Sequence, residues 1–285
     1  AGRPFKLETG KMAGLANAAF MASYGETNVL CTVTASDKPR EGVDFFPLSV
    51  DYEEKMYSVG RFPGSFQRRE GKATEKAILS SRCIDRPIRP LFPKDMRNDC
   101  SVVATVMSVD PDCSPEITAA IGVSAAIAVS DIPWDGPIAS TAVGLLDGEI
   151  IINPTLDQRV KTDLTLTVSS TEDLVAMIEA GGNEIPEDLM YDCIMAGHEV
   201  NREIVKFIKG IVAEIGKEKF TFESSNPDPE IMEEIENFCI EDVKKALDTD
   251  DKNVRDAALL PIYDAVHAKF DEKFEGNEAK IDEIM

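Results

Sequence analysis

The chain is organised around residues 60–93, GRFPGSFQRREGKATEKAILSSRCIDRPIRPLFP. Residues 61–94 hold nine basic side chains against three acidic ones, a local balance of +6, although the formal net charge of the whole chain is -22. The other residues therefore sum to -28. A basic segment in an acidic chain favours a local site for a polyanion, because guanidinium groups bind phosphate bidentately and release its counterions.

The first part of this stretch is predicted to be a loop, because a Pro-Gly pair interrupts it. Within the loop an aromatic ring stands directly before an amide and two guanidinium groups, a set suited to contact with single-stranded RNA: Phe66, Gln67, Arg68 and Arg69. Residues 72–84 read as a short helix. For Arg82, Arg86 and Arg89 the favoured interpretation is surface charge or ion pairing, because they lie among apolar residues and near an aspartate.

Three strings carry a resemblance to a known family: SVDYEEKMYSVG (49–60), GRFPGSFQRREGK (60–72) and IDRPIRPLFP (84–93). Together they resemble the signature of the first ribonuclease-PH-like core of bacterial polynucleotide phosphorylase. The resemblance continues through LDGEIIINPT (146–155), EAGGNEIPED (179–188) and the helical tail. It implies an α+β fold, in which a ribonuclease-PH-like core of mixed sheets packed with helices, with a two-layer topology like that of a ribosomal protein, precedes a small all-α domain.

Length and charge favour two domains. With 285 residues, 43% of them hydrophobic, the chain is long enough for one large core and a smaller one. We predict the first ribonuclease-PH-like core at 1–218 and an acidic all-α domain at 219–285, incomplete or leading to an absent second core, since the family carries two copies of the core. The segment SSNPDPE (224–230) is the best linker candidate. Residues 211–285 hold nine basic and 21 acidic side chains, which predicts a poor RNA binder.

Sequence patterns predict the elements of the core. β-Branched and alternating runs predict strands at 5–10, 28–35, 45–52, 101–109, 138–146, 149–152, 163–169 and 175–178. Residues 13–21 read as helix or strand, and the resemblance favours a strand. Asp147 and Gly148 predict a two-residue hairpin turn.

Helix signals are clear at several places. Ser114, Pro115 and Glu116 predict the start of a helix that is apolar on nearly every face and therefore buried. A long amphipathic helix is predicted from Pro186 to a cap at Gly216. Two more are predicted at 231–247 and 254–274, with a proline at residue 261 that starts or kinks the second.

Composition limits the location and the class of protein. The isoelectric point near 4.5 predicts that any RNA contact is local and sensitive to salt. Six scattered cysteines, without a CxxC pair or a histidine at zinc-ligand spacing, predict buried thiols in a reducing compartment. No run approaches the roughly 18 to 20 apolar residues of a membrane span, and charged residues interrupt the start of the chain, unlike a signal peptide. We expect a cytoplasmic protein without a membrane partner.

Several kinds of active site are not indicated by the sequence. A GxxxxGK[ST] loop is missing, which argues against a nucleotide triphosphatase. His198 and His267 lie on predicted helices without a GxSxG elbow, which argues against a serine or cysteine triad. We interpret His198 as a surface or packed helix residue.

The resemblance also implies where in the family's proteins catalysis occurs. In the family inorganic phosphate is the nucleophile, and the competent site lies in the second core, with a serine-rich phosphate loop, two aspartates six residues apart, and Mg²⁺ or Mn²⁺. At the corresponding place this chain has residues 113–117, CSPEI. Pro115 and Glu116 are expected to abolish that phosphate pocket, because Glu116 would repel the anion. Asp157 and Asp163 match the aspartate spacing and are weak metal candidates, with solvated or structural roles favoured. No catalytic residue is assigned to this chain.

The resemblance implies the N-terminal part of a phosphate-dependent 3′-to-5′ exoribonuclease of mRNA degradation, which releases nucleoside diphosphates and reversibly polymerises them. This core is expected to be non-catalytic, to build a homotrimeric ring, and to guide single-stranded RNA through a central opening lined by Phe66, Arg68 and Arg69. The resemblance also leaves open that the ring binds partner proteins of an RNA-degradation complex. Where the family commonly has two adjacent phenylalanines, this chain has Phe66 and then Gln67, so one stacking face is lost. The alternative is a non-enzymatic RNA-binding scaffold subunit of an exosome-like ring.

Overall fold

The computed structural model describes residues 2–40, 42–64, 66–226, 228–274, 281, 282 and 284. The chain forms two compact units, Ala1–Glu223 and Ser224–Met285. The domain limits expected from the sequence, 1–218 and 219–285, stay a prediction. Outside the described residues lie Ser65 of the basic stretch, Pro227 of the linker candidate, and residues 275–280 of the predicted all-α domain.

The first unit contains a five-stranded mixed sheet in the order β1-β2-β3-β5-β4. Its strands are β1 (Phe5–Thr9), β2 (Ala18–Tyr24), β3 (Thr27–Pro39), β4 (Leu48–Glu54) and β5 (Asn98–Ser108). Neighbouring strands are antiparallel except β4 and β5, which are parallel. Every second residue of β3 from Thr27 to Val33 is buried, because one face of this sheet covers the core.

The crossover between the parallel strands β4 and β5 carries the basic stretch. It consists of the 3₁₀ helix η1 (Met56–Val59), an irregular loop, helix α1 (Glu75–Ile88) and the 3₁₀ turn η2 (Arg89–Leu91). Helix α1 begins after Thr74, whose hydroxyl accepts a hydrogen bond from the Ala77 N–H at 3.0 Å. Parallel strands need a long connection, whereas antiparallel neighbours can be joined by a tight turn. The topology therefore leaves room for a loop here.

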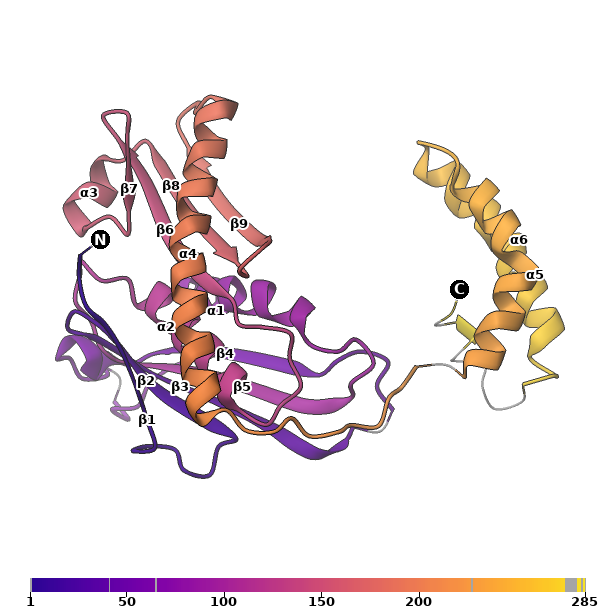
Figure 1. Ribbon diagram of the computed structural model, residues 1–285, viewed down its shortest axis with the longest axis horizontal. Coiled ribbons are helices and arrows are strands. Elements are labelled where there is room, and N and C mark those ends of the chain that lie inside the picture. Colours follow the sequence, from indigo (N-terminus) through magenta and orange to yellow (C-terminus); the bar gives the residue numbers. More distant parts are fainter. Residues whose placement is uncertain are drawn as a thin grey trace. The chain divides into compact units, whose positions relative to one another are not determined.

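Helix α2 (Pro115–Val129) lies between the two sheets of the first unit (Figure 1). It packs on β2 and β3 on one side and on β6 and α4 on the other. The Ser114 hydroxyl caps it by accepting the Ile117 N–H at 3.3 Å, which confirms the predicted start. Twelve of its 15 residues are buried. Its small side chains let the backbone approach the sheet closely.

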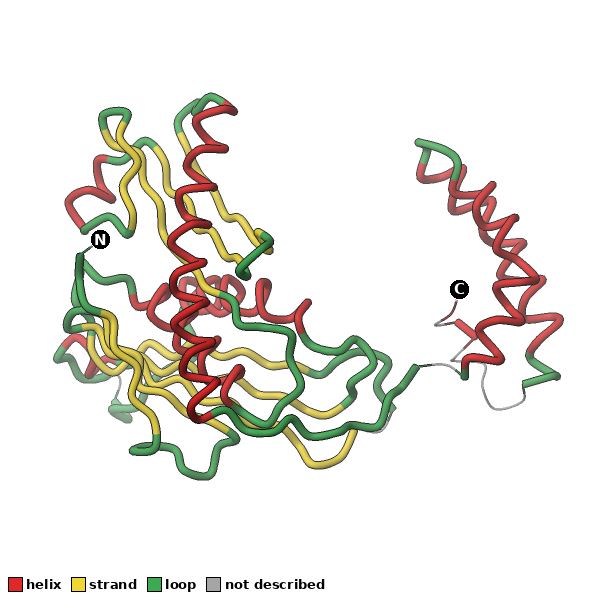
Figure 2. Tube along the Cα trace, viewed as in Figure 1, coloured by secondary structure: helices red, strands yellow, loops and turns green. Residues whose placement is uncertain are grey.

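The second sheet is antiparallel, in the order β7-β6-β8-β9. Figure 2 shows its strands as a group separate from the first sheet. They are β6 (Ala139–Leu146), β7 (Glu149–Ile152), β8 (Leu164–Ser170) and β9 (Val175–Gly182). Asp147 and Gly148 have φ values of 52° and 81°, which confirms the predicted two-residue turn. Helix α4 (Glu187–Ile215) packs on β6, β7 and β8, and the short α3 (Leu156–Lys161) contacts β6.

The second unit has its own small core. Its helices are α5 (Pro229–Leu247) and α6 (Lys252–Phe270). The buried residues that join them are Ile231, Ile235, Cys239, Val266, Phe270 and Ile281. Asp251 caps α6 by accepting the N–H groups of Asn253 and Val254, so Pro261 lies inside the helix and does not start it.

The predicted strands are all present, β7 with the predicted limits and the others with one or both ends shifted. Residues 13–21, which read as helix or strand, contribute to strand β2. Helix α1 begins later than the predicted residue 72 and continues through Pro87 to Ile88. Helix α3 was not predicted, because a single short amphipathic turn between strands has no clear periodicity.

Neither a membrane-spanning helix nor a disulfide is found among the described residues. Within the described residues, no helix is both long and apolar enough to cross a bilayer. The described residues include all six cysteines, and no disulfide joins them. Five of these cysteines are buried and Cys83 is half-buried.

His198 is buried and its Nδ1 lies 2.9 Å from the Ser170 hydroxyl, which confirms a packed helix residue.

Gly122→Ala is expected to destabilise the first unit. A Cβ added at residue 122 would lie 2.7 Å from the Cys31 Sγ and 2.8 Å from the Ala22 Cβ, so α2 or the sheet would have to move. Overpacking of this kind costs about 1–3 kcal/mol, against the roughly 1 kcal/mol that alanine gains over glycine in a helix.

Gly210→Ala in α4 is the matched control, because an added Cβ there meets nothing within 4 Å. Urea unfolding followed by circular dichroism should show a lower free energy of unfolding for Gly122→Ala and an equal or higher one for Gly210→Ala. Equal gains in the two variants would contradict the close packing of α2.

Candidate nucleic-acid interface and the cavity beside it

The basic loop comprises residues 60–74, and hydrogen bonds to η1 fix it near both ends. The Arg61 N–H donates to the Met56 carbonyl oxygen at 3.0 Å. The Met56 N–H in turn donates to Glu70 Oε1 at 2.9 Å. These bonds hold the two sides of the loop to the same short helix.

Between those anchors the loop exposes aromatic and basic side chains. Phe66 is fully exposed (103%) and Phe62 is 79% exposed. Four basic side chains of the loop are exposed and form no ion pair with any described residue: Arg61, Arg68, Arg69 and Lys72. An uncovered ring beside unpaired guanidinium groups is the arrangement that non-specific single-strand binding uses. The structure therefore brings the predicted set of Phe66, Gln67, Arg68 and Arg69 together on one exposed segment.

The arginines that follow on α1 and η2 have other roles. Arg86 Nη1 lies 2.9 Å from Glu179 Oε2 on β9. Arg89 Nη2 lies 2.8 Å from Asp85 Oδ1, one turn earlier. These ion pairs confirm the interpretation from the sequence for both residues. Arg82 is exposed and pairs with no acid among the described residues, so it is a surface charge.

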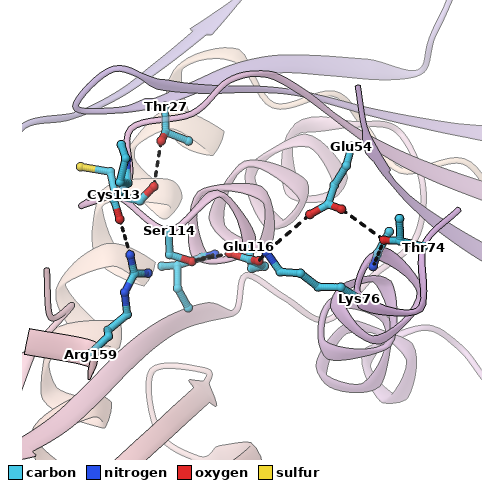
Figure 3. A network of polar contacts seen from close by, with 11 residues as sticks. Thr27, Glu54, Thr74, Lys76, Cys113, Ser114, Glu116 and Arg159 are labelled. Atoms are coloured by element: carbon cyan, nitrogen blue, oxygen red, sulfur yellow. Dashed lines mark hydrogen bonds and ion pairs between the residues drawn. The ribbon is translucent and has the colours of Figure 1, made fainter. Parts of the chain in front are cut away.

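A polar network lies beside the first turn of α1, where the N-terminus of α2 approaches it (Figure 3). Lys76 Nζ is 3.2 Å from Glu116 Oε1 and 3.6 Å from Glu54 Oε1. The Ser114 hydroxyl donates to Glu116 Oε2 at 2.8 Å. The Thr74 hydroxyl donates to Glu54 Oε2 at 3.2 Å. The network thus connects β4, the start of α1 and the start of α2.

The electrostatics of the network keep both central groups charged. Burial acts to raise the pKa of Glu116, but its own backbone N–H, the charge of Lys76 and the Ser114 hydroxyl outweigh burial and hold that pKa below its ordinary value. The charge of Glu116 raises the pKa of Lys76, against a smaller opposing effect of burial. At neutral pH the pair is therefore an ammonium and a carboxylate.

A cavity of about 290 Å³ opens next to this network. Its walls come from α1, α2, α3, β6 and β8, with apolar side chains such as Leu79 and Ile117. Its charged wall residues are Lys76, Asp112, Glu116 and Arg159. A cavity is present here, and Glu116 lies on its wall. The expected loss of phosphate binding would therefore come from the charge of Glu116 and not from a lack of room.

The two aspartates considered for a metal lie elsewhere. Asp157 is in the first turn of α3 and Asp163 directly precedes β8, and both are exposed. Neither is among the described residues that line the cavity. In the part of the chain that the structure describes, no three His, Cys, Asp or Glu side chains come together to hold a metal ion. The metal role considered for Asp157 and Asp163 therefore stays a prediction from their spacing in the sequence.

The network and the cavity were not found from the sequence. Thr74 and Ser114 can each be recognised there as a helix cap, but Lys76 and Glu116 are far apart along the chain. Only the packing of α1 and α2 against the same sheet brings them into contact. A pairing that depends on tertiary structure leaves no local pattern.

Two adjoining family models match this chain. Domain 1 of the 3′ exoribonuclease family matches residues 1–133, and domain 2 of the same family matches residues 136–200. The first match contains the basic loop and α1, and the second contains the antiparallel sheet.

Two curated relatives show what the chain is similar to. A polyribonucleotide nucleotidyltransferase of Lachnoclostridium phytofermentans is 55% identical over 273 residues, which cover 95% of this chain and 39% of the relative. Another, from Ruminiclostridium cellulolyticum, is 50% identical over 285 residues, which cover 100% of this chain and 40% of the relative. The chain therefore spans about two fifths of the length of these relatives.

A solved structure supports the fold. Rice (Oryza sativa) Rrp46 matches with a TM-score of 0.60 and 18% identity, over 74% of this chain and 95% of the rice chain. At that identity the likeness shows the fold alone, and it confirms the predicted α+β, ribonuclease-PH-like architecture. The resemblance to polynucleotide phosphorylase is confirmed by relatives about 50% identical along the whole chain. With the two domain matches, these findings show that the chain belongs to the 3′ exoribonuclease family.

Proposed function

We propose that this chain is the N-terminal part of a polyribonucleotide nucleotidyltransferase that degrades mRNA by phosphorolysis. The support is the identity of 50 to 55% with relatives so named, over 95 to 100% of this chain. In the whole enzyme inorganic phosphate attacks the last phosphodiester bond. The 3′-terminal nucleotide leaves as a nucleoside diphosphate, and the reverse reaction extends RNA without a template.

We also propose that this core contributes no catalytic residue. The described residues form no metal-holding group, and the wall of the cavity carries a carboxylate that would repel phosphate. Phosphate, Mg²⁺ or Mn²⁺ would then act in a second core beyond the residues of this chain. The role left to this core is to bind and direct the substrate.

The observation that carries the substrate-binding role is the exposed loop. The Phe66 ring is free to stack on a base, and the Arg68 and Arg69 guanidinium groups are free to bind phosphates of the same strand. Gln67 adds a polar contact in place of a second ring. We propose that three copies form a ring with these loops around a shared opening, through which single-stranded RNA passes.

A non-enzymatic scaffold is the second candidate. The cavity favours the scaffold, because its Lys76 and Glu116 are paired with each other. A scaffold subunit needs a surface for RNA and no reacting groups. The identity of 50 to 55% with relatives named polyribonucleotide nucleotidyltransferase favours the enzyme. The absence of a disulfide among the described cysteines fits a reducing compartment, and we propose a cytoplasmic enzyme.

Replacing both loop arginines, Arg68→Ala with Arg69→Ala, should weaken binding of fluorescent oligo(A). Each phosphate contact on a single strand adds about 0.7 to the slope of log affinity against log salt, so the slope should fall by about 1.4. Fluorescence anisotropy across a salt series measures both quantities.

The matched control is Lys244→Ala with Lys245→Ala, which removes the same charge from two exposed lysines of α5 that are paired with acids. This control should bind oligo(A) nearly as the unmodified chain does. An unchanged affinity and salt slope in the arginine variant would remove the loop from the RNA path.

Incubation with oligo(A), inorganic phosphate and Mg²⁺ should give no ADP from this chain alone. A longer polypeptide that includes the second core should release ADP under the same conditions. Appreciable ADP from the chain alone would show that this core is catalytic. Absence of ADP from both would instead reject phosphorolysis and favour the scaffold.

A further inference from the structure

The apolar surface around the basic loop is larger than the Phe66 ring alone. Phe62 is 79% exposed, and Tyr57 and Val59 of the adjoining η1 are also exposed. Single exposed apolar side chains are ordinary on a protein surface, whereas a group of them beside charged residues is typical of an interaction site. The candidate interface therefore continues from the middle of the loop back to η1.

Phe62 lies in a part of the loop whose backbone is fixed. Gly60 ends η1 in the left-handed conformation, with a φ of 68°, and its N–H donates to the Tyr57 carbonyl oxygen at 2.9 Å. The Arg61 N–H also donates to a backbone carbonyl oxygen of η1. Pro63 disfavours helical backbone angles at Phe62 itself. A ring attached to a fixed backbone loses less conformational freedom when a ligand binds.

The Phe62 ring is available to a base. Within the described residues it contacts neither another aromatic ring nor a cation. Arg61, directly before it, is one of the four basic side chains of the loop that pair with no described acid. A ring next to such a guanidinium group can stack on a base while the cation binds a phosphate of the same strand.

The two exposed phenylalanines of the loop can meet different bases of one strand. Phe66 is four positions after Phe62, so their Cα atoms are at most about 14 Å apart. No ring contact joins them, so the rings do not stack on each other. Gln67 beside Phe66 carries no ring. Phe62 is therefore the other stacking face that the loop offers.

We infer that Phe62 is a second base-stacking position, so that the loop holds two bases of one single strand, one on Phe62 and one on Phe66. The inference rests on the RNA role proposed for the loop, and it adds a residue and a footprint of two bases. The combination of rings with unpaired cations favours a single-stranded nucleic acid over an apolar protein partner, which would leave the cations without acceptors.

Phe62→Ala tests the inference, because it removes a ring and leaves the charge of the loop unchanged. The affinity for oligo(A) should fall at least about fivefold, since one base loses its stacking partner. The slope of log affinity against log salt should stay that of the native chain, because no phosphate contact is removed. Fluorescence anisotropy across a salt series measures both quantities.

Three controls separate stacking from other effects of the ring. An abasic oligoribonucleotide of the same length should bind Phe62→Ala as tightly as it binds the native chain, because it has no base to stack. Phe62→Trp keeps a ring and should bind oligo(A) at least as tightly as the native chain. Phe45→Ala removes a ring that is 60% exposed but lies outside the loop, and it should leave oligo(A) affinity unchanged.

The outcomes distinguish this inference from the proposed function of the loop. If Phe66→Ala weakens oligo(A) binding and Phe62→Ala does not, the loop still binds RNA and the second stacking position is wrong. If neither variant weakens binding, both proposals are overturned, and the rings are left to a protein partner. Equal losses for oligo(A) and the abasic strand, or an equal loss in Phe45→Ala, would also overturn the inference, since stacking at residue 62 would not be the cause.

Discussion

Close packing of one helix of small residues, α2, is the constraint on which the first unit depends. Its backbone approaches the first sheet so closely that a Cβ at Gly122 would meet Cys31 and Ala22. The opposite side of the same helix contacts β6 and α4. Because α2 is held from both sides, its N-terminus is fixed in position, and the orientation of Ser114 and Glu116 in the cavity follows from it.

The topology of the first sheet explains how an acidic chain presents a basic loop. A parallel pair of strands needs a long connection, and the crossover from β4 to β5 supplies the residues that η1 and α1 then anchor. The excess of acidic charge elsewhere does not prevent RNA contact, because at ~0.1 M salt exposed charges separated by more than about 10 Å are largely screened. A local cluster therefore decides whether a phosphate-rich strand is attracted.

Local patterns in the sequence were enough to predict the turn at Asp147, the start of α2 and every strand except β2, since each depends on neighbours within a few residues. The basic loop could be predicted from its charge and its Pro-Gly pair, and its role in RNA binding stays a prediction. The pairing of Lys76 with Glu116 could not, because it arises only when two helices pack on one sheet. The sequence left open whether Pro261 starts or kinks the last helix, and the cap at Asp251 sets the start of α6 before this proline.

The most direct measurement of the central claim is the fluorescence of Phe66→Trp on addition of oligo(A). The only native tryptophan, Trp134, is 9% exposed, so the new ring is the exposed reporter. Stacking of bases on residue 66 predicts quenching that saturates with oligo(A) and weakens as salt rises. Fluorescence of residue 66 that stays unchanged while oligo(A) binds would contradict the claim that RNA meets the chain at this loop.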